Sequence, residues 1–433
     1  MMRVFALLCI LWAVSSEALG ADSTPAERVA TVAATKGLIA FWDFALTRDV
    51  AWTSYRDEAV VDRQYPVYLR RIGDPKSYDP DTWPYKDDDS RLRFDTSGPF
   101  GHALRCNKGY IFAEVPRSAF DRTPLDVHGR EPFTLIAWIR FVGKRHLVAG
   151  IWDEGGWDKY GGRRQVALFG GLFGSQGVIA HISATGASSY PQSTARGSQY
   201  ARARAIDGGE FTNGQWVALA MTFNPEKHEV VAYLDGQATA STIVDPVARD
   251  VFGESAPTAS NPFHFPWPIY SPRSFVLKFN GYDIESSGVY EHWLEVDADQ
   301  GTIRYDRSSP SVVRGEYRVQ VDLDRDEKSL LETPLAFAAV SGATVRLPNG
   351  RRMAPGDTLV TRLEVRENNG DWRPVGSEIR YQIREGAPFT FGRALGLGTE
   401  PIDHGSQIDI DGVAVFNRVL SEGELKSLSF SRR

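Results

Sequence analysis

The sequence predicts an all-β protein, a sandwich or jelly roll into which a second antiparallel β domain is inserted. Short β-rich segments recur at short intervals between glycine-rich turns, which is typical of such folds. Residues 211–236 form two expected strands that are apolar on both faces, which indicates cover on both sides. After Val244 a stretch rich in proline and aromatic residues (252–273) leads to segments that alternate cleanly between apolar and polar residues.

The N-terminus predicts an exported protein. Arg3 precedes an apolar run, Val4–Val14, and Ala18 and Gly20 are small residues at the −3 and −1 positions of a cleavage site. We therefore expect residues 1–20 to be a signal peptide, and the mature protein to be secreted or periplasmic. No later stretch approaches the ~20 apolar residues of a membrane span, so we expect no membrane insertion after cleavage.

Composition excludes several classes. Hydrophobic residues make up 42% and charged residues 24%, with a net charge of −6, as in soluble globular proteins. This balance lacks the basic footprint of a nucleic-acid-binding protein. Cys9 leaves with the signal peptide, so Cys106 alone can form neither an intramolecular disulfide nor a cysteine-based zinc site. We expect Cys106 to be a small core residue.

The first domain is expected over residues 37–245 and 387–433, after a short helical leader at 21–36 that opens with a capping box at Thr24 and Glu27. Residues 46–95 are polar and predict a long surface excursion that contains one weak hairpin. The expected strands are Gly37–Phe44, Phe100–Leu104, Tyr110–Pro116, Phe133–Val142, His146–Trp152, Arg164–Gly170, Val178–Ser183, Gln215–Phe223, Glu229–Leu234, Phe389–Arg393 and Ile408–Asn417. A second capping box at Ser421 and Glu424 predicts a terminal helical turn.

The inserted domain is expected over residues 246–386, including the proline- and aromatic-rich linker. Its segments alternate between apolar and polar residues, so we expect antiparallel sheets with one face in water. The expected strands are Ser274–Gly281, Val289–Asp297, Gly301–Asp306, Glu316–Leu323, Leu359–Glu367 and Glu378–Ile383.

Six short motifs follow one another in an order that resembles the laminin-G-like jelly-roll domains of the concanavalin-A-like lectin and glucanase superfamily. They are Gly37–Phe44, Gly98–Leu104, Phe133–Ile139, Gln215–Leu219, Tyr233–Gly236 and Ile410–Ser421. The resemblance implies two curved antiparallel sheets packed face to face. It also implies binding of glycans or proteins, calcium in many members, and glycosidase or lyase activity in some. Fold alone does not decide among these functions.

The strongest enzymatic candidate is the acidic segment Glu295–Asp299. Alternation along a strand places Glu295, Asp297 and Asp299 on one face, as a glycosidase carboxylate pair requires. However, the last acid is aspartate where jelly-roll glycosidases have glutamate, and the segment lies in the insert and ends in a hairpin turn. Turn acids are common, so we interpret this segment as structural and assign no catalytic residue.

Calcium is the one cofactor that the sequence leaves open. Asp43, Asp409 and Asp411 lie near expected strand ends, and carboxylate oxygens suit Ca²⁺. The alternatives are that Asp409 and Asp411 cap turns or pair with Arg393 or Arg418. No ligand is assigned.

The predicted ligand site rests on alternation of loops in an antiparallel meander. If the strands from His146 to Leu234 run consecutively, the loops 153–163 and 184–214 share one end of a sheet, together with the Asp235–Gly236 turn. The aromatic rings suit stacking on sugars, and arginines suit carboxylate or sulfate groups. The predicted ligand-binding residues at this end are Trp152, Trp157, Tyr160, Arg163, Tyr190, Tyr200, Arg202 and Arg204. The alternative is that Trp152 and Trp157 pack under the loop and that the arginines are solvated or paired.

The sequence favours a secreted, non-catalytic protein that binds polysaccharide or glycoprotein glycans, with an anionic polysaccharide as one ligand class, or that mediates adhesion. From 185 to 209 it has Arg196, Arg202 and Arg204 against Asp207 alone, which hints at an anionic ligand. The alternatives are a polysaccharide-active hydrolase or lyase of the same fold and, more weakly, a protein–protein interaction module.

Overall fold

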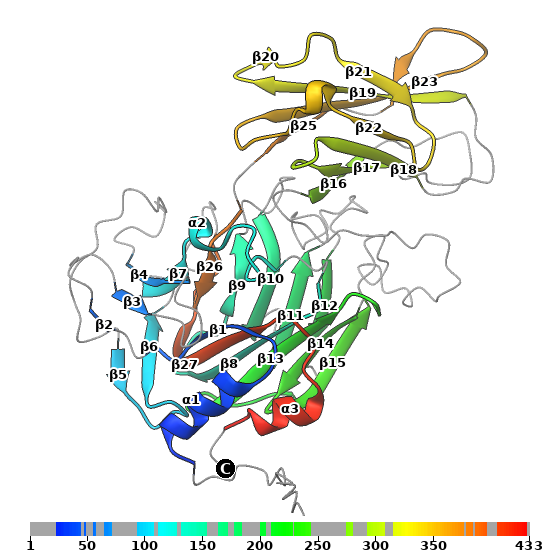
Figure 1. Cartoon of the computed structure of the whole chain (residues 1–433). Helices are drawn as coiled ribbons and strands as arrows, with labels where there is room; N and C mark the ends of the chain where they lie inside the picture. The colour runs from blue at the N-terminus through cyan, green and yellow to red at the C-terminus, as the bar shows by residue number, and fades with distance from the viewer. Residues whose placement is uncertain are drawn as a thin grey trace, which may run out of the picture.

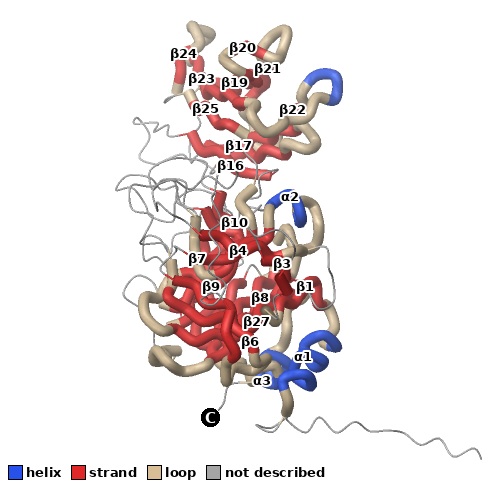
Figure 2. The backbone as a smooth tube through the Cα atoms, turned by 90° about the vertical axis from the view of Figure 1, so that its left-hand side faces the viewer, coloured by secondary structure: helices blue, strands red, loops and turns tan. Residues whose placement is uncertain are grey.

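The computed structural model is all-β, with two bodies of antiparallel sheet (Figures 1 and 2). It describes residues 23–44, 47–48, 55–57, 65–71, 93–107, 111–127, 131–153, 163–171, 177–183, 200–204, 209–227, 229–243, 274–279, 292–307, 315–375, 378–383, 386–395 and 405–430. We call the body formed by described residues 23–243 and 386–430 the first sandwich, and that formed by 274–383 the inserted sandwich. No helix among these residues has the length and apolarity needed to cross a membrane.

Within the described residues, the strands of the first sandwich form one continuous hydrogen-bonded sheet that folds into two layers. Layer A, in hydrogen-bonded order, is β12-β11-β10-β9-β26-β7-β4-β3-β2. Its strands are β2 Thr47–Arg48, β3 Tyr55–Asp57, β4 Val67–Arg71, β7 Ile111–Val115, β9 Leu147–Asp153, β10 Arg163–Gly170, β11 Val178–Ser183, β12 Tyr200–Arg204 and β26 Phe389–Phe391.

Layer B is β15-β14-β13-β8-β27, and the far side of β27 pairs with both β1 and β6. Strand β5 adds to β6, and β6 connects to β7 of layer A. The strands are β1 Leu38–Trp42, β5 Arg93–Asp95, β6 His102–Asn107, β8 Phe133–Phe141, β13 Val217–Asn224, β14 Glu229–Leu234, β15 Gln237–Ile243 and β27 Gln407–Phe416.

The main core lies between the layers. It joins Ile151, Val166 and Ala180 of layer A to Leu135 and Leu219 of layer B, and Cys106 is buried in it as expected. Strand alternation explains this arrangement because every second residue of a strand faces the same side.

Two helices cover the outer face of layer B: α1 (Pro25–Ala34) and α3 (Glu422–Ser427) (Figure 1). Both begin with the expected capping boxes, at Thr24–Glu27 and Ser421–Glu424. Beneath them lies a second cluster that contains Trp138, whose indole Nε1 donates to the carbonyl oxygen of Leu428 at 2.7 Å. The helices thereby shield an apolar sheet face that would otherwise meet water. The short helix α2 (Arg117–Phe120) follows β7 in layer A.

The inserted sandwich has a separate core between two sheets. One sheet is β16 Ser274–Phe279, β17 His292–Asp297, β18 Thr302–Arg307 and β22 Thr344–Arg346. The other contains β19 Glu316–Arg325, β20 Lys328–Ser329, β21 Leu335–Ala338, β23 Thr358–Arg366, β24 Arg373–Pro374 and β25 Ile379–Gln382, and a 3-10 turn covers Pro348–Gly350. All six strands expected in the insert are present, and the alternating burial of β19 and β23 confirms a face in water.

The expected consecutive meander is wrong. Strand β13 does not continue the sheet of β11 but pairs with β8 in layer B, with Val217 opposite Ile139. The Asp235–Gly236 turn therefore belongs to layer B, where Gly236 packs against Lys426 of α3. The stretch 184–214 was also expected to be a loop, but it contains β12. In the polar excursion 46–95 the described residues form β2 to β5 instead of one weak hairpin.

Candidate functional site

The strand register brings four strand ends to one edge of layer A. Asp153 at the end of β9 lies opposite Arg163 at the start of β10, and Ser183 at the end of β11 lies opposite Tyr200 at the start of β12. Strands β10 and β11 are themselves antiparallel neighbours. The connections 154–162 and 184–199 therefore leave from the same edge, which we call the β9–β12 edge. This part of the loop prediction is confirmed even though the meander is wrong.

The face of layer A that points away from the main core carries aromatic and ionisable side chains. Phe169 lies edge-to-face with Trp152, with ring centroids 5.9 Å apart, and with His146 at 5.2 Å. The ring centroid of His181 lies 5.4 Å from that of Trp152 and 5.0 Å from that of Phe169. Arg164, which the register places opposite Trp152, is fully buried. We call these five residues the outer cluster of layer A.

Trp152 does not present a free ring. Its side chain is 1% exposed and packs in a small cluster with Leu147, Phe169 and Ile179. A buried indole cannot serve as an open stacking surface for a sugar ring. This burial therefore favours the alternative interpretation, in which Trp152 packs instead of contacting a ligand directly.

Strand β12 places three predicted ligand residues beside the outer cluster. The register pairs Tyr200 with Ser183, Arg202 with His181 and Arg204 with Ile179. Directly paired positions of an antiparallel ladder belong to the same sheet face. Positions 200, 202 and 204 thus share the face of His181 and Ile179. Arg163 is the first residue of β10, and Trp157, Tyr160 and Tyr190 lie outside the described residues.

Sequence reasoning missed Arg164, Phe169 and His181. The signal for Phe169 and His181 is the alternation of β10 and β11, in which Val166, Leu168, Ala180 and Ile182 enter the main core. The residues next to them along each strand must then face the other side. Arg164 carries no such signal, because it reaches that side only through the shift in register between Arg164 and Val166. Interpreting β10 and β11 only as core strands leaves out the side chains on the face away from the main core.

The acidic segment of the insert is occupied by structural contacts. Glu295 accepts a hydrogen bond from Arg304 at 3.1 Å, and Asp297 Oδ1 accepts from the backbone N–H of Gln300 at 3.0 Å. Asp299 Oδ1 accepts from Arg122 of the first sandwich at 2.8 Å. Each acid thus has a separate partner, which supports the structural interpretation of this segment.

The three aspartates considered for calcium have different surroundings. Asp409 is fully buried, and Arg105 and Arg140 donate to both of its oxygens, so it does not fit a metal ligand. These arginines also replace the expected partners Arg393 and Arg418. The described residues contain no group of three or more His, Cys, Asp or Glu side chains suited to a metal ion.

Asp411 sits in a bulge of β27 and holds the loop before β6. Its Oδ2 accepts from the backbone N–H groups of Phe100 at 2.6 Å and Gly101 at 3.3 Å. Burial raises the pKa of Asp411 to about 7, backbone hydrogen bonds oppose that rise, and the nearby charge of Asp43 adds to it. Asp411 therefore serves as a backbone acceptor in this loop, and its charge interacts with that of Asp43.

Comparison with known proteins gives distant likenesses only. No protein-family model and no curated protein sequence matches the chain. Domain 4 of AbnA, a GH43 extracellular arabinanase from Geobacillus stearothermophilus solved with arabinotriose, is similar with a TM-score of 0.35 and 11% identity, over 90% of this chain and 98% of that chain. Trypanosoma rangeli sialidase in complex with 2,3-difluorosialic acid gives a TM-score of 0.34 and 12% identity over 93% of this chain. This chain covers 37% of the sialidase. With TM-scores below 0.5, neither likeness carries an argument about function.

Proposed function

We propose that the protein is a secreted or periplasmic, non-catalytic glycan-binding protein whose ligand site lies at the β9–β12 edge. The observation that carries this proposal is the shared edge, because two connections that contain Trp157, Tyr160 and Tyr190 leave from it. We further propose that the first sandwich is a laminin-G-like jelly roll over 37–245 and 387–433, with an inserted domain at 246–386. Two antiparallel layers around one core are consistent with that assignment.

The proposed ligand is a polysaccharide or a glycoprotein glycan, with anionic polysaccharides as the favoured class. Arg163 begins β10 at the β9–β12 edge. Arg202 and Arg204 occupy positions of β12 on the outer face of layer A. Guanidinium groups match the planar geometry of carboxylate and sulfate. Trp157, Tyr160 and Tyr190 are proposed to supply ring faces, whereas Trp152 packs within layer A.

The proposal is tested with a double variant, Trp157→Ala with Tyr160→Ala, on a polysaccharide array that includes uronic and sulfated members. We expect retention to fall at least tenfold, because stacking on aromatic faces contributes to sugar binding. The melting temperature should change little. Trp372→Ala is the matched control, since Trp372 belongs to the inserted sandwich, where the guanidinium carbons of Arg318 and Arg366 lie 4.3 and 4.7 Å from its ring centre. Equal retention of the double variant and the wild type would contradict the proposed ligand site.

The same array separates binding from catalysis when it is read for released sugars. Glu295→Gln should leave glycan binding unchanged, because Glu295 pairs with Arg304 within the insert. A wild-type protein that releases products, together with loss of that activity in Glu295→Gln, would instead support the hydrolase alternative.

A further inference from the structure

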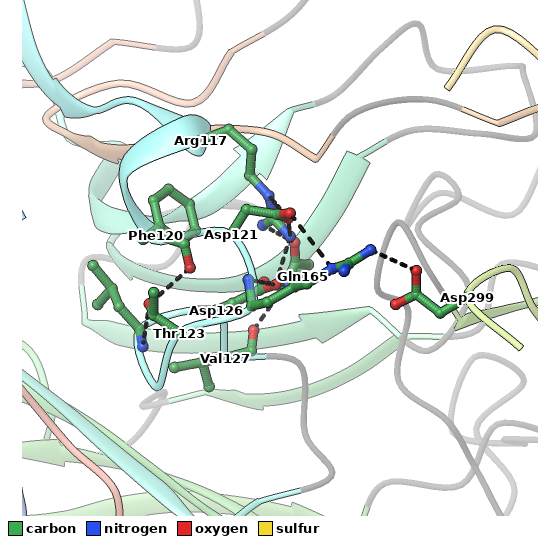
Figure 3. Close-up of polar contacts among 10 residues, drawn as sticks. Arg117, Phe120, Asp121, Thr123, Asp126, Val127, Gln165 and Asp299 are labelled. Carbon is green, nitrogen blue, oxygen red and sulfur yellow. Dashed lines mark hydrogen bonds and ion pairs between the residues drawn. The ribbon is translucent and has the colours of Figure 1, made fainter. Parts of the chain in front are cut away.

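The two sandwiches contact each other through an ion pair. Arg122 follows α2 in the first sandwich, and its Nη2 donates to Asp299 Oδ1 at 2.8 Å. Asp299 lies in the turn between β17 and β18 of the inserted sandwich (Figure 3). The side chains are 55% and 29% exposed, respectively, so water reaches both groups.

The loop that carries Arg122 is held in a specific conformation. Arg122 has a φ of 61°, in the left-handed region that few non-glycine residues adopt. Its backbone N–H donates to Asp126 Oδ2 at 3.3 Å. Thr123 Oγ1 donates to the carbonyl oxygen of Phe120 at 2.7 Å and accepts from the backbone N–H of Leu125. These bonds fix the direction in which the chain presents Arg122.

A buried polar network anchors this loop to β10 (Figure 3). Arg117 donates to Asp126 Oδ2 at 2.6 Å and to Gln165 Oε1 at 3.1 Å. Gln165 in turn donates to Asp126 Oδ1 at 3.2 Å and to the carbonyl oxygen of Val127 at 2.9 Å. Gln165 lies on β10 next to Arg164 of the outer cluster and two residues after Arg163 at the β9–β12 edge. The contact with the insert is therefore built onto the edge proposed to bind the ligand.

The opposite side of the contact is also preformed. Asp297 Oδ1 caps the turn by accepting from the backbone N–H of Gln300. Ala298 is buried in the core of the inserted sandwich, and its carbonyl oxygen accepts from the backbone N–H of Met353 at 2.9 Å. Because its neighbours are held on both sides, Asp299 projects from a turn that the insert itself keeps in place.

We propose that the inserted sandwich docks on the β9–β12 edge through Arg122 and Asp299 and thereby completes a ligand site shared by both sandwiches. The ligand part of this inference rests on the proposed function. Exposed ion pairs contribute little stability and are screened by salt. The docking is therefore charge-specific and reversible, and it weakens as ionic strength rises.

The docking is tested without a ligand by zero-length carbodiimide cross-linking of Arg122→Lys, which places an amine beside the carboxylate of Asp299. We expect a peptide that joins positions 122 and 299. Arg366→Lys is the matched control, because Arg366 pairs with Glu316 on the neighbouring strand of the inserted sandwich, at 2.6 Å and with side chains that are 35% and 63% exposed. Combining Arg122→Lys with Asp299→Asn should abolish the 122–299 product.

Ionic strength distinguishes a reversible contact between the two sandwiches from a pair held within one sheet. Between 50 and 500 mM NaCl, the 122–299 yield should fall at least twofold relative to the 366–316 yield, because the latter pair sits on adjacent strands of one sheet. A 366–316 product without any 122–299 product would overturn the docking.

The shared site is tested by charge reversal on the same polysaccharide array. Asp299→Arg should lower retention at least threefold, and Arg122→Asp combined with Asp299→Arg should restore it. Unchanged retention in Asp299→Arg, when the Arg122→Lys variant does form the 122–299 cross-link, would overturn the insert's part in the site. A wild type that retains no polysaccharide would overturn the proposed function, while the cross-link decides the docking by itself.

Discussion

Asp409 on β27 and Arg140 on β8 face each other in the ladder, and both Nε and Nη2 of Arg140 donate to Asp409 Oδ2, at 3.0 and 2.8 Å. Arg105 on β6 approaches the same carboxylate from the other side. One buried acid thus joins three strands of layer B, and Arg140 also stacks on Trp216, 4.8 Å from the ring centre.

Asp409→Asn should lower the free energy of unfolding by about 3 kcal/mol, because removing one partner of a buried ion pair leaves the others uncompensated. Glu316→Gln is the control: that carboxylate is 63% exposed, and its loss should cost less than about 1 kcal/mol. Urea unfolding of both variants measures the difference. Equal effects would show that the three-strand contact contributes no more than a surface pair.

Asp411→Asn should change how stability depends on pH. Burial raises the pKa of Asp411 from 3.8 to about 7, so between these pH values the folded protein binds more protons at this group than the unfolded chain does. Its contribution to stability is present at acidic pH and is lost as pH rises from about 4 through about 7. Asparagine keeps an acceptor for the Phe100 N–H and does not ionise.

The Asp411→Asn variant should therefore gain stability relative to the wild type as pH rises, with the largest gain above pH 7. Thermal unfolding at pH 4.5, 6 and 8 measures this difference. A constant difference across the series would mean that Asp411 keeps an ordinary pKa in the folded protein.

Gly236→Ala should destabilise the protein more than Gly214→Ala. Both glycines have a left-handed φ, 75° and 89°, so alanine costs roughly 1–2 kcal/mol at either position. At Gly236 a Cβ would also collide with the backbone of Lys426, whereas at Gly214 it meets no described atom within 4 Å. The collision should add about 1–3 kcal/mol. Chemical denaturation of the two variants tests the contact between this turn and α3, and similar losses would argue against it.

Trp152→Ala should lower the free energy of unfolding by about 3–5 kcal/mol, as expected for loss of a buried tryptophan. Trp157→Ala should change it by less than about 0.5 kcal/mol if Trp157 serves the ligand. Denaturation curves compared with retention on the array separate the two roles. A Trp152→Ala variant that stays stable but is no longer retained on the array would show that Trp152 contacts the ligand.

The local features of the fold could be predicted because they depend on neighbouring residues. The apolar run at Phe133–Phe141, the hairpin at Asp235–Gly236 and the two capping boxes are all present. The partner of β13 could not be derived, because Val217 and Ile139 are far apart in the sequence and either sheet would accept an apolar strand. The short strand β12 was missed because alternating alanine and arginine lacks the usual β-forming residues.

The site was predicted less completely than the fold. The shared edge could be derived from antiparallel connectivity within β9 to β12, whereas the burial of Trp152 depends on tertiary packing against Phe169. The network of Arg117, Asp126 and Gln165 could not be predicted, because it joins three segments of the chain and no local sequence motif marks these residues.

The position of β26 and β27 has a consequence for biosynthesis. Strand β26 fills the gap between β7 and β9, and β27 pairs with β1, β6 and β8, yet both are encoded after the entire insert. A nascent chain leaving the ribosome can close the inserted sandwich while both layers of the first one still lack a central strand. Translation of the segment that contains β26 and β27 should therefore be the step that completes the first sandwich, and a chain truncated before Phe389 should expose unpaired strand edges prone to aggregation.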